Sequence, residues 1–409
     1  MNTLTGKFDG LRPGEAAGFR PARLRVLIVE PHGSGGNWHY AHALSGALLA
    51  AGLEVVLGTL SPVENLADLD QVRVRIIGVS RRGSTWSPST LARRMLNHVG
   101  KLIGLIQVVN EFRPDVVHLH DPVGKLDFLY MRVLRLMGSK IVYTAYSPRP
   151  LSWKVTWFDW ARYRGADAVL VHSENAVADL VSAGVDIGRI VQIPHGNFLR
   201  FCDNLGLNQI EARRLLSLPD SARVVLFFGG ISPHKGVDVL IEAFSRALRV
   251  DPDLRLVIAG DPRMDVSEYE RTIERLALGS RVLMDLRYIP FGEFAKFFVA
   301  CDVVALPYRR NYQSGILQLA YGFGRPVIVT DVGGISDAVR SDETGVVAGS
   351  GDAQALAEAI RQILADPEST RMMGRRARHV AETKYSWGAV ARIVTEVYES
   401  VSGRNRGIH

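Results

Sequence analysis

Three segments of the chain could each bind a phosphate group through backbone amides. Residues 32–37 (HGSGGN) follow the first expected strand, and residues 228–236 (FGGISPHKG) add Lys235 to a glycine-rich turn. In residues 313–316 (QSGI), a serine can cap a helix whose first amides point outward. Glycines permit close backbone approach, and a helix N-terminus adds positive potential. The segments therefore predict a diphosphate ligand, although each could also be an ordinary capped turn.

Two familiar phosphate-binding motifs do not fit these segments. Residues 32–37 lack the third glycine of the dinucleotide fingerprint, and the next strand ends in Gly58 and Thr59 where that fingerprint expects an acid. Lys235 is followed by Gly236, whereas a Walker A loop requires Ser or Thr there. The sequence therefore argues against a simple dehydrogenase and against a P-loop nucleotidase.

Histidines end two strands that read as buried. His118 and His120 share one face of the first, because side chains alternate along a strand, and His172 ends the second. A histidine at a strand end can act as an acid, a base or a hydrogen-bonding group, or it can be a satisfied core residue. We expect His120 to be the functional one and, with Lys235, to be catalytic.

Strand-like and helix-like segments alternate along the chain in two series. Strands are expected at residues 25–30, 54–57, 72–77, 115–120, 140–144, 168–172 and 190–193, then, after a polar stretch at 198–221, at 224–228, 254–259, 303–306 and 327–330. A helix is expected at 39–51. Apolar strands between helices predict an α/β fold of two Rossmann-like, doubly wound parallel sheets. Ligands in such sheets bind at the carboxyl ends of the strands, here in a cleft between the domains.

The length and composition of the chain are typical of a folded protein with two domains. A chain of 409 residues exceeds the usual size of one core, and its 47% hydrophobic and 22% charged residues are ordinary for a folded protein. The two cysteines form no CxxC pair, which argues against a zinc site and fits a reducing compartment. No acidic pair demands a metal. Without an apolar leader or a spanning segment, we expect a cytoplasmic protein.

Charge and tryptophans favour an anionic partner for the N-terminal half. Residues 1–198 contain 22 basic and 16 acidic side chains. Trp153, Trp157 and Trp160 share one helical face, and Arg162 and Arg164 follow them. Such a helix can lie at an anionic membrane surface, or it can pack on the sheet. The basic residues lack interleaved strand aromatics, which disfavours nucleic acid. We therefore predict a peripheral place at the inner face of the membrane.

Several longer segments resemble glycosyltransferase family 4, a retaining family with the GT-B fold. They are residues 229–244 (GGISPHKGVDVLIEAF), 256–261 (LVIAGD), 302–308 (DVVALPY), 314–334 (SGILQLAYGFGRPVIVTDVGG), 115–120 (DVVHLH) and 193–197 (IPHGN). The resemblance runs from Arg23 to Ser402. It implies an acceptor-side domain at 1–198, a nucleotide-sugar domain at 199–385 and a helix at 386–402 that packs back on the first domain.

The resemblance also implies roles for individual residues. Lys235 would contact the donor diphosphate, and the amides of Ser314, Gly315 and Ile316 would hold phosphates. Donor contacts are further implied for Gly35, Gly36, Gly229, Gly230, Tyr288, Ile289, Gln313 and Gln318, and acceptor-side contacts for Asn37, Tyr146 and Asn197. The implied donor is linked to UDP or GDP, no metal is needed, and the acceptor is a hydroxyl of a lipid-linked glycan or polysaccharide.

The chain departs from the family pattern at several positions. Gly230 stands where the family often has arginine, and Tyr146 where many members have histidine. The two family glutamates fall on Asn311 and Leu319, with Gln318 beside the second. The pattern indicates a variant branch without the glutamate pair. Two alternatives stay open, namely a nucleotide-sugar epimerase of the same shape and a non-catalytic GT-B partner protein.

Overall fold

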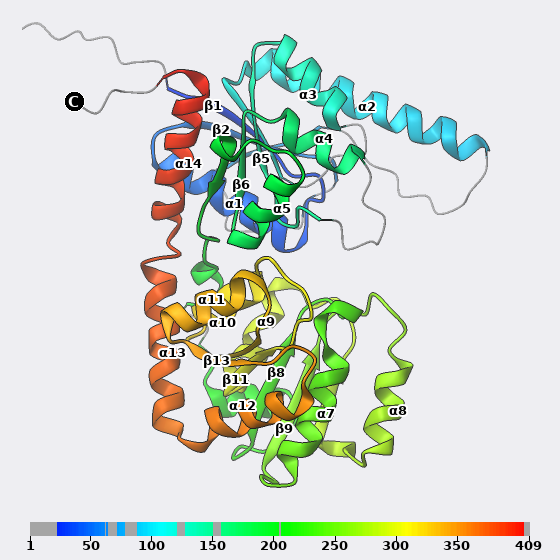
Figure 1. The fold of residues 1–409 in the computed structure, drawn as a ribbon, viewed down its shortest axis with the longest axis vertical. Coiled ribbons are helices and arrows are strands. Elements are labelled where there is room, and N and C mark those ends of the chain that lie inside the picture. Colours follow the sequence, from blue (N-terminus) through cyan, green and yellow to red (C-terminus); the bar gives the residue numbers. More distant parts are fainter. Residues whose placement is uncertain are drawn as a thin grey trace, which may run out of the picture.

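The computed structural model describes residues 23–61, 63, 72–77, 88–120, 127–149, 157–203 and 206–404. The chain forms two α/β domains, one above the other in Figure 1. The N domain contains a seven-stranded sheet of order β3-β2-β1-β4-β5-β6-β7, and the C domain a six-stranded sheet of order β10-β9-β8-β11-β12-β13. All described strand pairs are parallel. The predicted fold class of two doubly wound parallel sheets is therefore confirmed.

The N domain buries both faces of its sheet. Its elements are β1 (Arg25–Val29), α1 (Gly35–Ala50), β2 (Glu54–Thr59), β3 (Arg73–Ile76), α2 (Pro88–Phe112), β4 (Val116–His120), α3 (Asp127–Leu136), β5 (Lys140–Thr144), α4 (Trp157–Gly165), β6 (Ala168–Val171), α5 (Glu174–Ser182) and β7 (Ile190–Gln192). Leu27 packs toward Leu105 of α2, and Ile28 toward Leu44 of α1. Both faces are covered, which explains the continuous apolar runs of the central strands.

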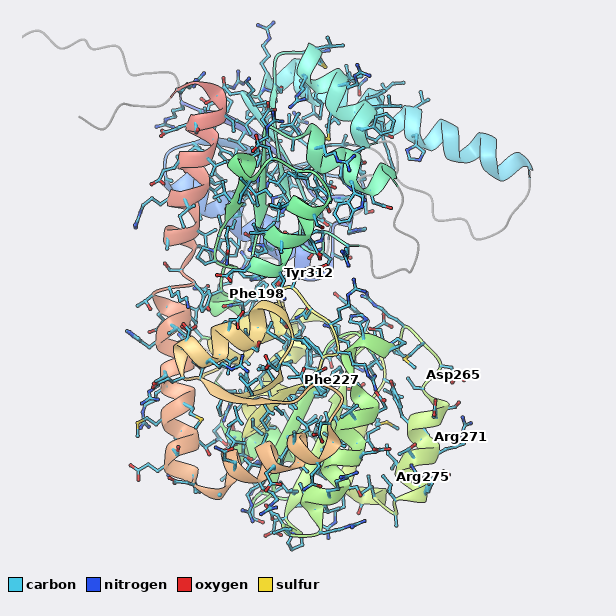
Figure 2. All side chains as sticks on the ribbon, in the orientation of Figure 1. Phe198, Phe227, Asp265, Arg271, Arg275 and Tyr312 are labelled. Atoms are coloured by element: carbon cyan, nitrogen blue, oxygen red, sulfur yellow. The ribbon has the colours of Figure 1, made fainter. Side chains whose placement is uncertain are left out.

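The C domain repeats this arrangement around one large core. Its elements are α6 (Gln209–Leu215), β8 (Arg223–Phe228), α7 (Val237–Leu248), β9 (Leu254–Ala259), α8 (Ser267–Arg275), β10 (Val282–Asp285), α9 (Phe294–Ala300), β11 (Val303–Leu306), α10 (Gly315–Gly322), β12 (Val327–Thr330), α11 (Gly333–Asp342), β13 (Gly345–Ala348), α12 (Ala353–Ala365) and α13 (Pro367–Glu382). Phe227 of β8 is fully buried in this core (Figure 2).

Three local features differ from the expectations. Helix α1 begins at Gly35, four residues before the expected start, so Gly35 and Gly36 lie inside its first turn. Strands β10 and β13 were not predicted. Both lie at sheet edges, where one side has no neighbouring strand and residues are mostly half-buried. Each is four residues long and includes a residue that is depleted in strands, Asp285 in β10 and Gly345 in β13.

The chain crosses back to the N domain at its C-terminus. Helix α13 runs beside the C domain, and α14 (Trp387–Ser402) beside the N domain (Figure 1). Val394 and Tyr398 of α14 share a core with Leu44 of α1. Where the helices meet, the Trp387 indole donates to the Asn197 carbonyl at 2.8 Å. This contact ties the crossover to the segment that joins the two domains.

Helix α4, expected to offer a membrane face, makes folding contacts in its described part. Trp160 packs against the N-domain core, and the buried Arg162 pairs with Asp127 and Asp159. Trp153 lies outside the described residues, as do Arg81, Arg82 and Trp86. Within the described chain, no helix is both long enough and apolar enough to cross a bilayer.

Candidate functional site

A pocket of about 470 Å³ lies between the two domains. The N domain contributes the turn after β6, with His172, and the segment after β7, with His195. The C domain contributes Gln313 and Gln318 at the start of α10, together with the first turns of α11. These segments follow the carboxyl ends of their strands. The cleft expected from the strand order is therefore present.

Lys235 and Ser314, far apart in sequence, are joined through one tyrosine. The ammonium nitrogen of Lys235 lies 3.6 Å from the ring centroid of Tyr308, within cation–π range. The hydroxyl of Tyr308 lies 3.4 Å from the Ser314 hydroxyl. Tyr308 is fully buried, so its ring is a fixed support for both groups. The lysine and the start of α10 therefore face one common region.

The first turn of α10 offers unused amides to that region. The Ser314 hydroxyl accepts a hydrogen bond from the Leu317 amide at 3.3 Å and so caps the helix. The preceding amides of Gly315 and Ile316 have no partner within a helix that starts there. The Cβ position of Gly229 is 3.4 Å from the Ile316 side chain, so the Lys235 loop abuts this turn. An anion between them would meet both a cation and a helix N-terminus.

Several cations lie near the lysine loop, of which Arg263 also pairs with Asp261 at 3.7 Å. Burial lowers the pKa of His234, and the nearby cations Lys235, Arg310 and Arg263 lower it further. His234 therefore stays neutral at pH 7 while three cations gather around it. Such a cluster would attract the negative charge of a diphosphate.

Two buried amides stand at the pocket without partners for their oxygens. The side-chain oxygens of Gln313 and Gln318 are inaccessible to solvent and accept no hydrogen bond in the described structure. Gln318 is only 2% exposed and lines the pocket. The side-chain nitrogen of Asn311, just before them, is likewise buried without a partner. A buried polar atom without a partner is costly, which favours a ligand with hydroxyl groups.

The structure places His172 and His195 at the pocket, and His120 behind them. Burial and the neighbouring His195 hold the pKa of His172 well below its usual range, and burial lowers that of His195 to about 4. Both rings are thus neutral hydrogen-bonding groups. His120 is fully buried against the Tyr146 hydroxyl at 2.8 Å and does not line this pocket. Burial also holds the pKa of His120 well below 6.5, and its expected catalytic role stays a prediction.

Tyr40 of α1 lies at the centre of an aromatic cluster behind the pocket. Its ring centroid is 5.4 Å from that of His172, 5.0 Å from that of His195 and 5.8 Å from that of His120. The ring of Tyr40 therefore packs against both pocket histidines and helps to hold them in place. Sequence reasoning weighed His172 but missed His195, although it stands in the IPHGN segment that was singled out.

Some of the remaining predicted residues are accessible to a ligand. Gly35 and Gly36 have no atom within 4 Å of their Cβ positions, so a ligand can approach the first turn of α1. Asn37, half-buried, follows them in that turn. Tyr288 is 51% exposed, after β10. Ile289 is buried in the C-domain core, so only its backbone could meet a base.

Two expected acceptor-side residues are engaged inside the protein. The Asn197 amide donates to the Ala381 carbonyl at 2.7 Å and its backbone to Tyr385 at 2.9 Å. Tyr146 is buried against His120. Gly230, expected at the donor, has the Arg263 guanidinium 3.1 Å from its Cβ position, so an arginine does approach this loop, from another segment.

The loop before α10 also joins the two domains. Tyr312 lies where the two domains meet (Figure 2) and is buried in the N-domain core. Its hydroxyl donates to the carboxylate of Asp179 on α5, which pairs with Arg149 at 3.2 Å. Gly334 of α11 approaches so closely that a Cβ there would lie 2.5 Å from Ser173 of the N domain. The residues that frame the pocket therefore also hold the domains together.

Tyr312→Phe is expected to weaken this interdomain contact by about 1.5–3 kcal/mol, because the hydrogen bond to a carboxylate is lost while the ring stays packed. Scanning calorimetry should show the first unfolding transition lowered by several degrees. Tyr312→Ala should lower it further, since the buried ring is lost as well. A Phe variant that melts like the wild type would contradict the assignment.

Both halves of the chain match known protein families. Residues 35–196 match the model described as "Glycosyl transferase 4-like domain". Residues 208–380 match the model described as "Glycosyl transferases group 1". The two models together cover most of the chain. The chain belongs to the GT-B glycosyltransferases.

Individual relatives of this GT-B glycosyltransferase agree with that membership. The D-inositol 3-phosphate glycosyltransferase of Corynebacterium urealyticum is 33% identical over 246 residues, which are 58% of this chain and 57% of that protein. The chain thus spans little more than half of that relative's length. The one from Salinispora tropica is 30% identical over 59% of this chain and 52% of its own length.

Solved structures share the fold over almost the whole chain. Anabaena HepE (Alr3699) in complex with UDP superposes with a TM-score of 0.72 at 20% identity, covering 92% of this chain and all of that one. Sucrose-phosphate synthase from Thermosynechococcus elongatus reaches 0.73 at 24% identity, covering 94% and 100%. At such identities the likeness establishes the GT-B fold.

Proposed function

We propose that the chain transfers a sugar from a nucleotide diphosphate, UDP foremost and GDP as the alternative, to a hydroxyl acceptor with retention at the anomeric carbon. The observation that carries the proposal is the linkage Lys235–Tyr308–Ser314, which brings a cation and a helix N-terminus to one place beside the interdomain pocket. The HepE structures with UDP and with UDP-glucose support uracil as the base.

In this proposal the protein stabilises the leaving diphosphate as its charge develops. Lys235 and the amides of Gly315 and Ile316 supply preorganised positive potential, and Arg263 and Arg310 add long-range attraction. These groups provide the stabilisation without a metal ion. Closing the pocket between two domains keeps water from the reacting carbon.

The buried amides take the place of the two expected acids. Gln318 and Gln313 present oxygens without partners at the pocket, and the partnerless buried nitrogen of Asn311 lies just before them in the chain. Neutral amides can hydrogen-bond ribose or sugar hydroxyls as carboxylates do, with less electrostatic strength. We therefore propose an active member of a branch that has replaced its glutamate pair by amides.

The acceptor is proposed to enter from the N domain. His172 and His195 are neutral there and can hydrogen-bond a hydroxyl, and the first turn of α1 is open at Gly35 and Gly36. The surplus of basic residues in the N-terminal half favours an anionic acceptor. A lipid-linked glycan or polysaccharide fits this, as does a phosphorylated polyol of the kind named for the sequence relatives.

Calorimetry with UDP, GDP and ADP tests the donor site, each with and without EDTA. We expect one nucleotide to bind at one equivalent, with UDP tightest and EDTA without effect. Incubating the matching nucleotide-sugar alone, followed by NMR, separates transfer from epimerisation, because an epimerase converts the donor without acceptor. Well-folded protein that binds none of the nucleotides would refute the proposal.

A further inference from the structure

A second groove, of about 520 Å³, lies on the far side of the C domain. It is lined by Arg223 at the start of β8, Asp302 just before β11 and Pro326 just before β12. These positions are at the amino ends of parallel strands, whereas the interdomain pocket lies at the carboxyl ends. Helix α10 begins at the pocket and ends at Gly322, two residues before Gly324 of the groove. The two sites are therefore separate.

The wall of this groove is formed by one face of α13. Arg371, Gly374, Arg375 and Arg378 line it, at the spacing of neighbouring turns of a helix. Gly374 allows the helix to pack closely, since a Cβ there would lie 2.3 Å from the Gly324 carbonyl oxygen. The helix thus places a row of like charges directly over the groove floor.

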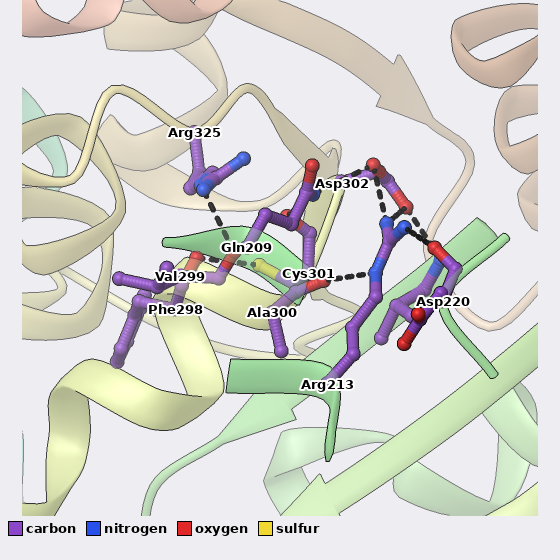
Figure 3. Close-up of polar contacts among 10 residues, drawn as sticks. Gln209, Arg213, Asp220, Phe298, Val299, Ala300, Cys301, Asp302 and Arg325 are labelled. Carbon is purple, nitrogen blue, oxygen red and sulfur yellow. Dashed lines mark hydrogen bonds and ion pairs between the residues drawn. The ribbon is translucent and has the colours of Figure 1, made fainter. Parts of the chain in front are cut away.

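The only carboxylate among the lining residues is already neutralised. Asp302 accepts hydrogen bonds from Arg213 at 2.8 and 3.0 Å, from Gln209 at 3.1 Å and from the backbone of β8 at 2.7 Å (Figure 3). Arg213 is itself buried, so this pair belongs to the fold. Asp302 therefore has little charge left to offset the arginines of the groove.

Three of the five lining arginines form no ion pair among the described residues. Arg223 pairs with Asp251, and Arg378 with Asp203 and Glu382. In contrast, Arg371 and Arg375 are exposed and have no such partner. Arg325 donates to the Val299 carbonyl at 2.9 Å (Figure 3), and its Nε is buried without a partner. The arginines repel one another across the groove unless an anion joins them.

We propose that this groove binds a ligand through phosphate groups. Planar guanidinium groups suit the oxygens of a phosphate, and several of them converging on one concave surface suit a polyphosphate or an anionic lipid headgroup. The volume is in the range of small-molecule sites. The proposal does not depend on the donor site, because no residue is shared between the two.

Calorimetry with inorganic pyrophosphate at 0.15 M salt tests the proposal, with and without UDP. Binding should persist with UDP present and weaken at least tenfold in Arg371→Gln/Arg375→Gln. Arg376→Gln is the matched control, since this arginine lies on the same helix, pairs with Glu343 and does not line the groove. Thermal unfolding should be unchanged in both variants, because none of the three arginine side chains is buried.

Sedimentation with vesicles of phosphatidylglycerol and phosphatidylcholine distinguishes a lipid source from a free phosphate. If the protein sediments with the vesicles, loses this in the double variant and does not bind pyrophosphate, the ligand is a lipid headgroup. If it binds pyrophosphate but does not sediment with the vesicles, the ligand is a soluble phosphate compound. Binding that UDP displaces, that the double variant retains, or that is absent with both probes overturns the proposal. Because UDP binding is measured separately, failure here and failure of the donor site are distinguishable.

Discussion

Lys235→Ala is expected to weaken nucleotide diphosphate binding at least tenfold and to slow sugar transfer by roughly 100- to 1,000-fold. The lysine is held over the Tyr308 ring at 3.6 Å, and the hydroxyl of that tyrosine lies 3.4 Å from Ser314, which caps α10. A charge-assisted contact contributes about 1.5–3 kcal/mol to binding, and a donor aimed at developing charge contributes more in the transition state. Calorimetry with UDP and initial rates with the matching sugar nucleotide measure the two effects.

The lysine variant has two useful comparisons. Lys235→Arg keeps the charge and should retain part of the binding, whereas Lys140→Ala removes an exposed lysine at the opposite end of an N-domain strand and should change nothing. The rate should fall more than the affinity if the lysine acts mainly on the leaving group. Affinity within twofold of the wild type would refute a diphosphate contact.

Acidification from pH 7 to pH 5 is expected to unfold the N domain before the C domain. Burial lowers the pKa of His98 and, more strongly, that of six further N-domain histidines. The pKa falls to about 3 or 4 for His39, His42, His118 and His195, and well below 6.5 for His120 and His172. In the unfolded chain these rings take up protons near pH 6.5, but in the folded chain they stay neutral. Stability is therefore full above pH 6.5 and falls as the pH drops toward 4.

The size of this effect comes from the number of histidines. Each ring whose folded pKa lies well below the pH contributes up to about 1.4 kcal/mol of lost stability per pH unit below 6.5. For six such rings, the free energy of unfolding of the N domain falls by an amount on the order of 5 kcal/mol or more by pH 5. Carboxylates with lowered pKa act mainly below pH 4, which keeps the two effects apart.

Tryptophan fluorescence can follow this unfolding selectively. All six tryptophans precede residue 161 or begin α14, so none belongs to the C domain. We expect the fluorescence midpoint in heat to fall steeply between pH 7 and pH 5, while a C-domain transition in calorimetry moves less. His42→Gln should reduce the pH dependence, and His379→Gln, on exposed α13, should not. A thermal midpoint of fluorescence that is the same at pH 7 and pH 5 would contradict this role of the buried histidines.

Much of this protein could be inferred from local sequence. The central strands were visible because parallel strands covered on both faces are continuous apolar runs, as in Arg25–Val29 and Arg223–Phe228. The loops that we propose to bind phosphate could be recognised, because their glycines, Lys235 and the capping Ser314 lie close together in sequence and act through neighbouring backbone. Strands β10 and β13 were not predicted, since each is only four residues long and contains a residue that is depleted in strands, Asp285 or Gly345.

The site as a whole was decided by tertiary structure. Lys235 and Ser314 meet only because strands β8 and β11 are neighbours, which brings Tyr308 between them. His195 reaches the pocket and His120 does not, because the packing of Tyr40 and Tyr146 sets the depth of each ring. In the basic groove, Arg325 at the amino end of β12 lies near the arginines of α13, which follow it by more than 40 residues in the sequence. Periodicity reports which face a residue occupies, but distances between segments follow from how the sheets and helices pack.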